Sequence, residues 1–140
     1  MVKQFAGVNE GLAELKQMGM KIGIVTSKLR PMVMRGIELI GIGEYLDVII
    51  SPEDTKLHKP NPEPALKASE LLCLEPHECV MVGDSVFDIS CGKQAGMKAI
   101  GVSYSLTSIE ELNKFNPDLI VDSIADIPDW IRGINAKRNI

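Results

Sequence analysis

The sequence predicts a single α/β domain, a three-layer, doubly wound arrangement in which helices cover both faces of a mostly parallel sheet. Segments typical of buried strands alternate with segments typical of helices along the chain. A chain of 140 residues suits one domain, and 45% apolar residues are enough to build a core. We expect one domain over residues 1–133 and a frayed tail over residues 134–140.

The expected helices carry apolar residues at helical spacing and begin at capping residues. In the first helix, Leu12, Leu15 and Met18 share one face, and Asn9 is the expected N-cap. Ser108 begins a short helix with a capping box. The other helices are expected at residues 31–40, 61–72 and 84–95, with one or two helical turns at 125–131.

The expected strands are short runs rich in β-branched residues, which is typical of the buried strands of a parallel sheet. They lie at residues 21–26, 47–50, 79–82, 99–102 and 119–121, the last of them at an edge. In such a sheet, ligands bind outside the carboxyl ends of the strands. The residues that follow the strands are therefore the candidates for a functional site.

Composition argues against several classes of partner. The net charge of −4 does not suit a nucleic-acid surface, and no apolar run is long enough for a membrane span. The first residues lack the apolar core of a secretory signal. Cys73, Cys79 and Cys91 show no C-x-x-C spacing and suggest small buried residues in a reducing compartment. We expect a cytoplasmic protein.

Two acids follow the expected strand at residues 79–82. Gly83 allows a tight turn, and Asp84 and Asp88 come next at i, i+4 spacing, on one face of a helix. Carboxylates crowded at a strand end repel each other unless a cation compensates them, so the pair suggests a divalent-metal site. The alternative is that Asp84 is a helix N-cap and Asp88 a solvated acid of the first turn.

Two further strand ends carry polar groups. Thr26 and Ser27 end a buried strand, where a hydroxyl and a backbone N–H suit a phosphate oxygen, although a threonine alone in this position is more often a simple strand-ending cap. Lys59 lies in a proline-rich loop with restricted backbone angles, which favours a positioned cation over a solvated one. We expect the neighbouring His58 to be a bystander and His77 to be solvated.

Three stretches of the chain, taken in order, resemble motifs two, three and four of the haloacid dehalogenase superfamily. They are Ile22 to Lys28, His58 to Pro64 and Val82 to Asp88. The sequences Lys-Pro-x-Pro and Gly-Asp-Ser-x-x-Asp within them resemble the phosphoglycolate phosphatase and pyrophosphatase branch. The resemblance extends from about residue 7 to residue 121 and implies a Rossmann-like core.

The resemblance also implies a role for each candidate residue. Thr26 would donate its hydroxyl to a transferring phosphoryl group, assisted by the backbone N–H of Ser27. Lys59 would bridge the phosphate and a nucleophile. Asp84 would bind Mg²⁺, while Asp88 would support the metal through water or orient Lys59. The implied substrate is a small phosphate monoester such as phosphoglycolate, or pyrophosphate.

The sequence departs from the family at its first motif, Asp-x-Asp-Gly, whose first aspartate attacks phosphorus and whose second acts as acid and base. None of the eight aspartates of the chain has Asp-x-Asp spacing, and the usual cap domain is missing as well. Without a nucleophile no covalent intermediate forms. We therefore expect a truncated core with little or no activity and with weak or absent Mg²⁺ binding.

In the family, the nucleophile strand lies between the strands that correspond to Ile22–Val25 and Cys79–Val82. Its absence predicts unpaired backbone groups, each costing about 1–3 kcal/mol when buried. We expect these two strands to close on each other into a smaller continuous sheet. Alternatively, a strand from another chain fills the gap, or the segment Val2 to Ala6 folds across it. The alternative function is a non-catalytic binding domain that forms a homodimer through the open sheet edge.

Overall fold

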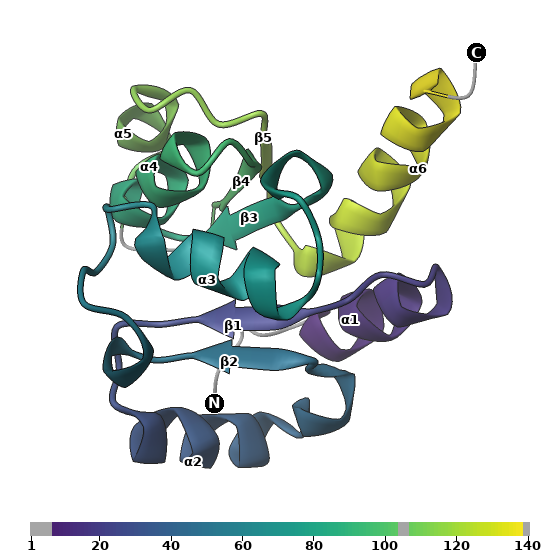
Figure 1. Ribbon diagram of the computed structural model, residues 1–140. Helices are drawn as coiled ribbons and strands as arrows, with labels where there is room; N and C mark the ends of the chain where they lie inside the picture. Colours follow the sequence, from purple (N-terminus) through teal and green to yellow (C-terminus); the bar gives the residue numbers. More distant parts are fainter. Residues whose placement is uncertain (1–6, 104–106, 139–140) are drawn as a thin grey trace.

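The computed structural model describes residues 7–103 and 107–138, and its strands and helices alternate as expected for an α/β fold. Figure 1 shows the order of these elements along the chain. They are α1 (Val8–Gln17), β1 (Gly23–Val25), α2 (Arg30–Ile40), β2 (Val48–Ile50), α3 (Glu63–Leu71), β3 (Val80–Gly83), α4 (Val86–Gln94), β4 (Lys98–Val102), α5 (Ile109–Asn113), β5 (Leu119–Val121) and α6 (Ile127–Arg138).

In the described part of the chain every strand pair is parallel, but the strands form two sheets. One sheet pairs β1 with β2, and the other has the order β3-β4-β5, with β5 at an edge as expected. The prediction that the first and third strands close on each other is therefore wrong. The predicted alternative in which Val2 to Ala6 cross the gap lies outside the described residues.

The two sheets stay apart because helices pack against both of them. From α1, Leu12 packs in one apolar cluster with Ile24 of β1, while Leu15 packs in another with Ile100 of β4. From α3, Ala65 packs in a third cluster with Met81 of β3. Helices seated on two sheets at once fix the distance between β1 and β3, so the two strands cannot approach to the roughly 4.8 Å that pairing requires.

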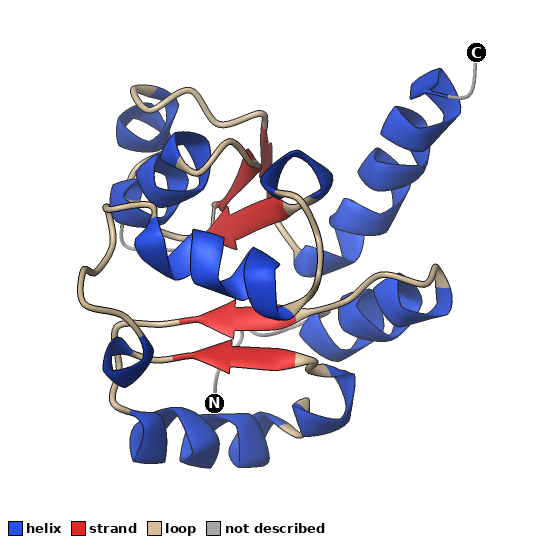
Figure 2. Cartoon of the chain, viewed as in Figure 1, coloured by secondary structure: helices blue, strands red, loops and turns tan. Residues whose placement is uncertain are grey.

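The helices form layers on both faces of the strands (Figure 2). Along β4, Ile100 packs against α1 and α6, while its neighbour Ala99 packs against α4 and α5 on the opposite face. Both residues are completely buried. Because successive strand residues point to opposite faces, apolar layers on both sides explain why this strand is apolar throughout.

Several ends of elements differ from the predictions. The N-cap of α1 is Gly7, in the left-handed region at φ 83°, and the predicted cap Asn9 lies inside the helix. The last helix does not stop near Gly133 but continues to Arg138, and Ile127 and Ile131 bury its first turns in the core. None of the helices in the described chain has the length and apolar character needed to cross a membrane.

The three cysteines differ in burial. Cys91 is completely buried in α4, whereas Cys73 is exposed in the turn after α3, where its φ is 61°. The expectation of three buried cysteines is therefore wrong for Cys73. Burial raises the pKa of the Cys91 thiol and, together with nearby Glu78, that of the half-buried Cys79.

Candidate functional site

A nearly buried ion pair lies at the carboxyl ends of the strands. Lys59 Nζ lies 2.6 Å from Asp88 Oδ1, and the two side chains are only 13% and 9% exposed. The same ammonium donates a hydrogen bond of 3.2 Å to the carbonyl oxygen of Val25, the last residue of β1. Lys59 therefore joins the end of β1, in one sheet, to the first turn of α4, which follows β3 of the other sheet. The peptide bond between Lys59 and Pro60 is cis.

The second oxygen of Asp88 is held by its own turn. Asp88 Oδ2 accepts hydrogen bonds from the backbone N–H of Asp84 at 3.2 Å and from Ser85 Oγ at 3.1 Å. Ser85 is also the N-cap of α4, since its Oγ accepts from the backbone N–H of Asp88. The alternative in which Asp84 caps the helix and Asp88 is solvated is therefore wrong.

Glycine at residue 83 permits this packing. A Cβ atom at Gly83 would overlap with both the Cβ and the carboxylate of Asp88. Farther along α4, a Cβ at Gly92 would lie 2.5 Å from Cβ of Met81 in β3. Both glycines let the helix approach the strand closely, and that approach brings Asp88 within reach of Lys59.

The strand end at Thr26 lies next to this ion pair, because Thr26 follows Val25 directly. Its backbone N–H continues the pairing with β2 by donating to Ile50 O at 3.0 Å. Its hydroxyl oxygen accepts from the backbone N–H of Lys28 at 3.1 Å, which leaves the hydroxyl proton available as a donor. Ser27 between them is exposed. The structure thus brings all three predicted motifs to one edge of the molecule.

Asp84 differs from Asp88 in being exposed. Its carboxylate has no hydrogen-bond or ion-pair partner among residues 7–103 and 107–138, and these ranges contain no group of three acidic, histidine or cysteine residues placed to hold a metal ion. Mg²⁺ commonly uses one or two carboxylates and completes its shell with water and substrate phosphate. The donor chemistry of Asp84 fits such an ion, whereas both oxygens of Asp88 are already engaged.

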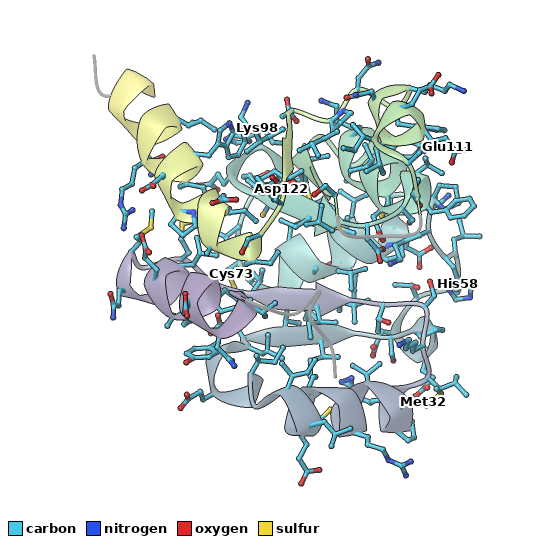
Figure 3. The ribbon with its side chains drawn as sticks, turned by 180° about the vertical axis from the view of Figure 1, so that it is seen from behind. Met32, His58, Cys73, Lys98, Glu111 and Asp122 are labelled. Atoms are coloured by element: carbon cyan, nitrogen blue, oxygen red, sulfur yellow. The ribbon has the colours of Figure 1, made fainter. Side chains whose placement is uncertain are left out.

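The two histidines stay outside this arrangement. His58 is exposed, and Figure 3 shows it at the periphery, on the side where β1 and β2 end. His77 is exposed in the turn before β3. Neither makes an ion pair within the described part of the chain.

Sequence reasoning missed two structural acids at the opposite ends of the strands. Asp47, just before β2, accepts from Lys16 Nζ and from the backbone N–H of Ile22, both at 2.7 Å. Asp118, just before β5, accepts from the N–H of Ala99 at 2.8 Å. The position of each acid immediately before a strand was the available signal. No signal in the sequence could have indicated the role of the Val25 carbonyl oxygen, because every residue carries a backbone carbonyl group.

The fold and the site together define a class of protein: a doubly wound α/β domain whose strand ends gather a hydroxyl, a nearly buried lysine and two acids. The chain belongs to the haloacid dehalogenase-like hydrolase family, whose model matches residues 1–102. The expected family and its Rossmann-like core are thus confirmed.

Relatives of known sequence or structure are similar over nearly the whole chain. A Clostridium perfringens relative is 48% identical over 134 residues, covering 96% of this chain and 63% of that protein. The pyrophosphatase PpaX of Bacillus velezensis is 39% identical, with coverages of 91% and 59%. The solved HAD phosphatase of Thermococcus onnurineus is 29% identical with a TM-score of 0.78, covering 91% of this chain and 57% of that chain. The chain thus spans about 60% of the length of these relatives.

Proposed function

We propose that this chain is the phosphate- and Mg²⁺-binding part of a phosphohydrolase that acts on a small phosphate monoester, such as phosphoglycolate, or on pyrophosphate. The observation that carries the proposal is the contact of Lys59 with both Asp88 and the end of β1. A cation held in this way is aimed at one place rather than free in solvent. The name of the Bacillus velezensis relative, a pyrophosphatase, supports the substrate class.

In this proposal, each residue has one task. Thr26 and the backbone N–H of Ser27 donate hydrogen bonds to phosphate oxygens. Lys59 contributes positive charge beside these phosphate oxygens. Asp88 is a positioning residue that orients the ammonium group of Lys59. Asp84 holds Mg²⁺, which when bound offsets phosphate charge.

We further propose that the 140 residues alone have little or no hydrolytic activity. They contain no Asp-x-Asp sequence to supply an attacking carboxylate and its acid–base partner. Residues of a catalytic site act as a unit, so binding groups without the nucleophile give a site that binds but does not turn over.

Two assays on the full chain test these statements. Calorimetric titration with inorganic phosphate in the presence of Mg²⁺ is expected to show weak binding that Thr26→Val and Asp84→Asn each reduce. The matched control, His58→Ala, changes an exposed neighbour of Lys59 and is expected to leave binding unchanged. Failure of the unsubstituted chain to bind phosphate would overturn the proposed function.

The second assay measures hydrolysis of p-nitrophenyl phosphate and of pyrophosphate with Mg²⁺. The expected result is no turnover above the rate of the Asp84→Asn variant. Robust turnover that this substitution abolishes would show that the inactivity statement is wrong while leaving the site assignment intact.

The alternative function is a non-catalytic domain that forms a homodimer through an open sheet edge. The observation behind it is that, among the residues that the structure describes, β1 and β3 each pair on one side only. Size-exclusion chromatography with light scattering decides this point, because a strict monomer at high concentration excludes the dimer. Cytoplasmic location and the absence of membrane and nucleic-acid partners stay predictions from composition.

A further inference from the structure

The lysine of the candidate site lies in a loop that other parts of the chain hold. This loop, residues 55–62, leads into α3, and we call it the lysine loop. In Figure 3, His58 marks its place, on the side where β1 and β2 end. From the loop, the side chain of Lys59 reaches Asp88 and the carbonyl oxygen of Val25. The position of the positive charge therefore depends on what fixes the backbone of the loop on either side of Lys59.

Glu63, the first residue of α3, holds the lysine loop before Lys59. Its Oε1 accepts from the backbone N–H of Lys56 at 2.8 Å, and its Oε2 accepts from that of Leu57 at 3.1 Å. Each carboxylate oxygen thus binds one of two successive backbone groups, and a charged acceptor makes such hydrogen bonds stronger. An acid in the first turn of a helix can offset the helix dipole without touching a loop, so these two contacts are an additional feature of Glu63.

Gln94, the last residue of α4, holds the lysine loop after Lys59. Its Nε2 donates to the carbonyl oxygen of Pro60 at 3.1 Å and to Ser90 Oγ, four residues earlier in the helix, at 2.8 Å. The same helix carries Asp88, the ion-pair partner of Lys59. One helix therefore fixes both the loop and the carboxylate that the lysine contacts.

The ammonium group of Lys59 has three N–H donors. Within the described residues, one of them donates to Asp88 Oδ1 at 2.6 Å and another to Val25 O at 3.2 Å. These contacts leave one donor for a ligand, and its direction follows from the position of the loop. Because Val25 directly precedes Thr26, both side chains expected to bind phosphate meet at the end of β1.

We propose that Glu63 and Gln94 are positioning residues, which hold the lysine loop from both sides so that the third donor of Lys59 stays directed at a bound phosphate. This inference rests on the proposed function, because it takes Lys59 as a phosphate-binding group. A ligand that meets a group already in place loses less free energy than one that must first order a loop. Neither residue touches the phosphate, and each acts through Lys59.

Nuclear magnetic resonance of the full chain tests the holding of Lys59 without any ligand. The ammonium protons of a lysine that is hydrogen-bonded and shielded from water exchange slowly enough to give a signal. The signal that Lys59→Met removes is assigned to Lys59. We expect Glu63→Gln and Gln94→Glu, which keep the size of each side chain but remove its contacts with the loop, each to broaden this signal or abolish it.

The matched controls are Glu10→Gln and Gln17→Glu in α1, which change the same groups by the same charge. Glu10 lies in the first turn of that helix and Gln17 is its last residue, as Glu63 and Gln94 are in α3 and α4. Both control residues are exposed, and within the described residues neither side chain makes a hydrogen bond to the lysine loop. We expect both controls to keep the ammonium signal of Lys59.

Calorimetric titration with inorganic phosphate and Mg²⁺ measures the consequence for binding. Glu63→Gln removes a negative charge beside the lysine loop, which by electrostatics alone would favour an anion. The proposal predicts the opposite sign: binding should weaken on the order of tenfold, the effect of losing one charge-assisted contact to the anion. Gln94→Glu should also weaken binding, whereas Glu10→Gln and Gln17→Glu should leave it unchanged.

The remaining outcomes are also decisive. An unchanged ammonium signal in both variants, or phosphate binding to the Glu63→Gln variant that is as tight as to the unsubstituted chain, overturns the proposal and leaves the proposed function intact. If the unsubstituted chain binds no phosphate, the proposed function fails, and the ammonium signal still decides whether the two residues hold Lys59. Gln94 is exposed, so Gln94→Glu keeps the test decisive even if the Glu63→Gln variant does not fold.

Discussion

At the residue scale, one ammonium group connects three motifs that lie far apart in the sequence. Lys59 reaches the end of β1 through Val25 O and the first turn of α4 through Asp88. Asp88 in turn is held by Ser85 and by the backbone of Asp84. Because the pair is nearly buried, removing one partner should cost far more stability than breaking an exposed ion pair.

We expect Asp88→Ala to lower the free energy of unfolding by about 3 kcal/mol, because Lys59 would remain as a poorly solvated charge. The control is Glu14→Ala, which breaks a pair with Arg132 whose side chains are 40% and 48% exposed and should cost about 0.5 kcal/mol. Urea denaturation measures both. Equal losses in the two variants would contradict the assignment of Lys59–Asp88 as a nearly buried pair.

Gly83→Ala tests the close approach of Asp88 to the strand. The added methyl group would overlap with Asp88, so we expect a loss of about 2 kcal/mol, as overpacking usually costs. Gly36 in α2 is the matched control, since a Cβ there meets nothing within 4 Å. Gly36→Ala should raise stability by about 0.5–1 kcal/mol. A neutral Gly83→Ala variant would show that the turn can relax.

At the element scale, each sheet is fastened at the amino ends of its strands by an aspartate placed just before a strand. Asp47 binds the backbone before β1 and also Lys16 of α1. Asp118 likewise binds the backbone of β4 at Ala99 and the side chain of Lys93 in α4. Each acid thus holds a strand and a helix to its own sheet, away from the candidate site.

The acid sensitivity of the fold should depend on Asp47. The hydrogen bond from Lys16, followed by that from the Ile22 N–H, lowers the pKa of Asp47 below its usual value of about 3.9. The unfolded chain therefore binds the proton more readily. The stabilising contribution is complete above the usual pKa and is lost as the pH falls through the lower pKa of the folded state.

Accordingly, Asp47→Asn should flatten the decline of stability below about pH 4, because one group that titrates differently in the two states is gone. Urea midpoints measured across this range give the slope. Glu38→Gln, at an exposed position of α2, is the control and should leave the slope unchanged. An unchanged slope for Asp47→Asn would refute the role of this acid.

At the scale of the whole molecule, two separately paired sheets are joined by helices, by Lys59 and by apolar contacts rather than by a continuous ladder. In β4, Ala99 and Ile100 are completely buried, while the residues of β1 are exposed or half-buried. Regions with fewer buried contacts open at lower free energy than the core.

Native-state hydrogen exchange should therefore separate the two sheets. We expect the amides of β4 to exchange only through global unfolding, and those that β1 and β2 share to exchange through a partial opening of lower free energy. Rising denaturant concentration distinguishes the two, because global openings depend on it more steeply. One shared opening free energy for both sheets would contradict this expectation.

Local sequence patterns were sufficient to predict the elements of the fold and the direction of strand pairing, but not the arrangement of the two sheets. The strand segments, the parallel pairing and the edge position of β5 were predicted, because β-branched runs alternating with helices allow few other arrangements. The separation of β1 from β3 was not predicted, since it depends on helices such as α1 that pack on two sheets at once.

The candidate site was likewise predicted in part: the meeting of its motifs was expected, but the surroundings of the individual acids were not. The motifs containing Thr26, Lys59 and Asp88 do meet, as their places at strand ends implied. The differing surroundings of Asp84 and Asp88 were not predicted, because the i, i+4 spacing does not show which carboxylate turns inward. That choice depends on Ser85 as N-cap and on the overlap that Gly83 avoids.

The hydrogen bond from Lys59 to Val25 O has a consequence for the register of any segment added beside β1. It uses one of the two lone pairs of the last acceptor on the open side of that strand and places a positive charge beside it. Because a shift of one residue turns every side chain of a strand to the opposite face, a fixed cation at this point favours the alignment that brings a negative or accepting group next to it.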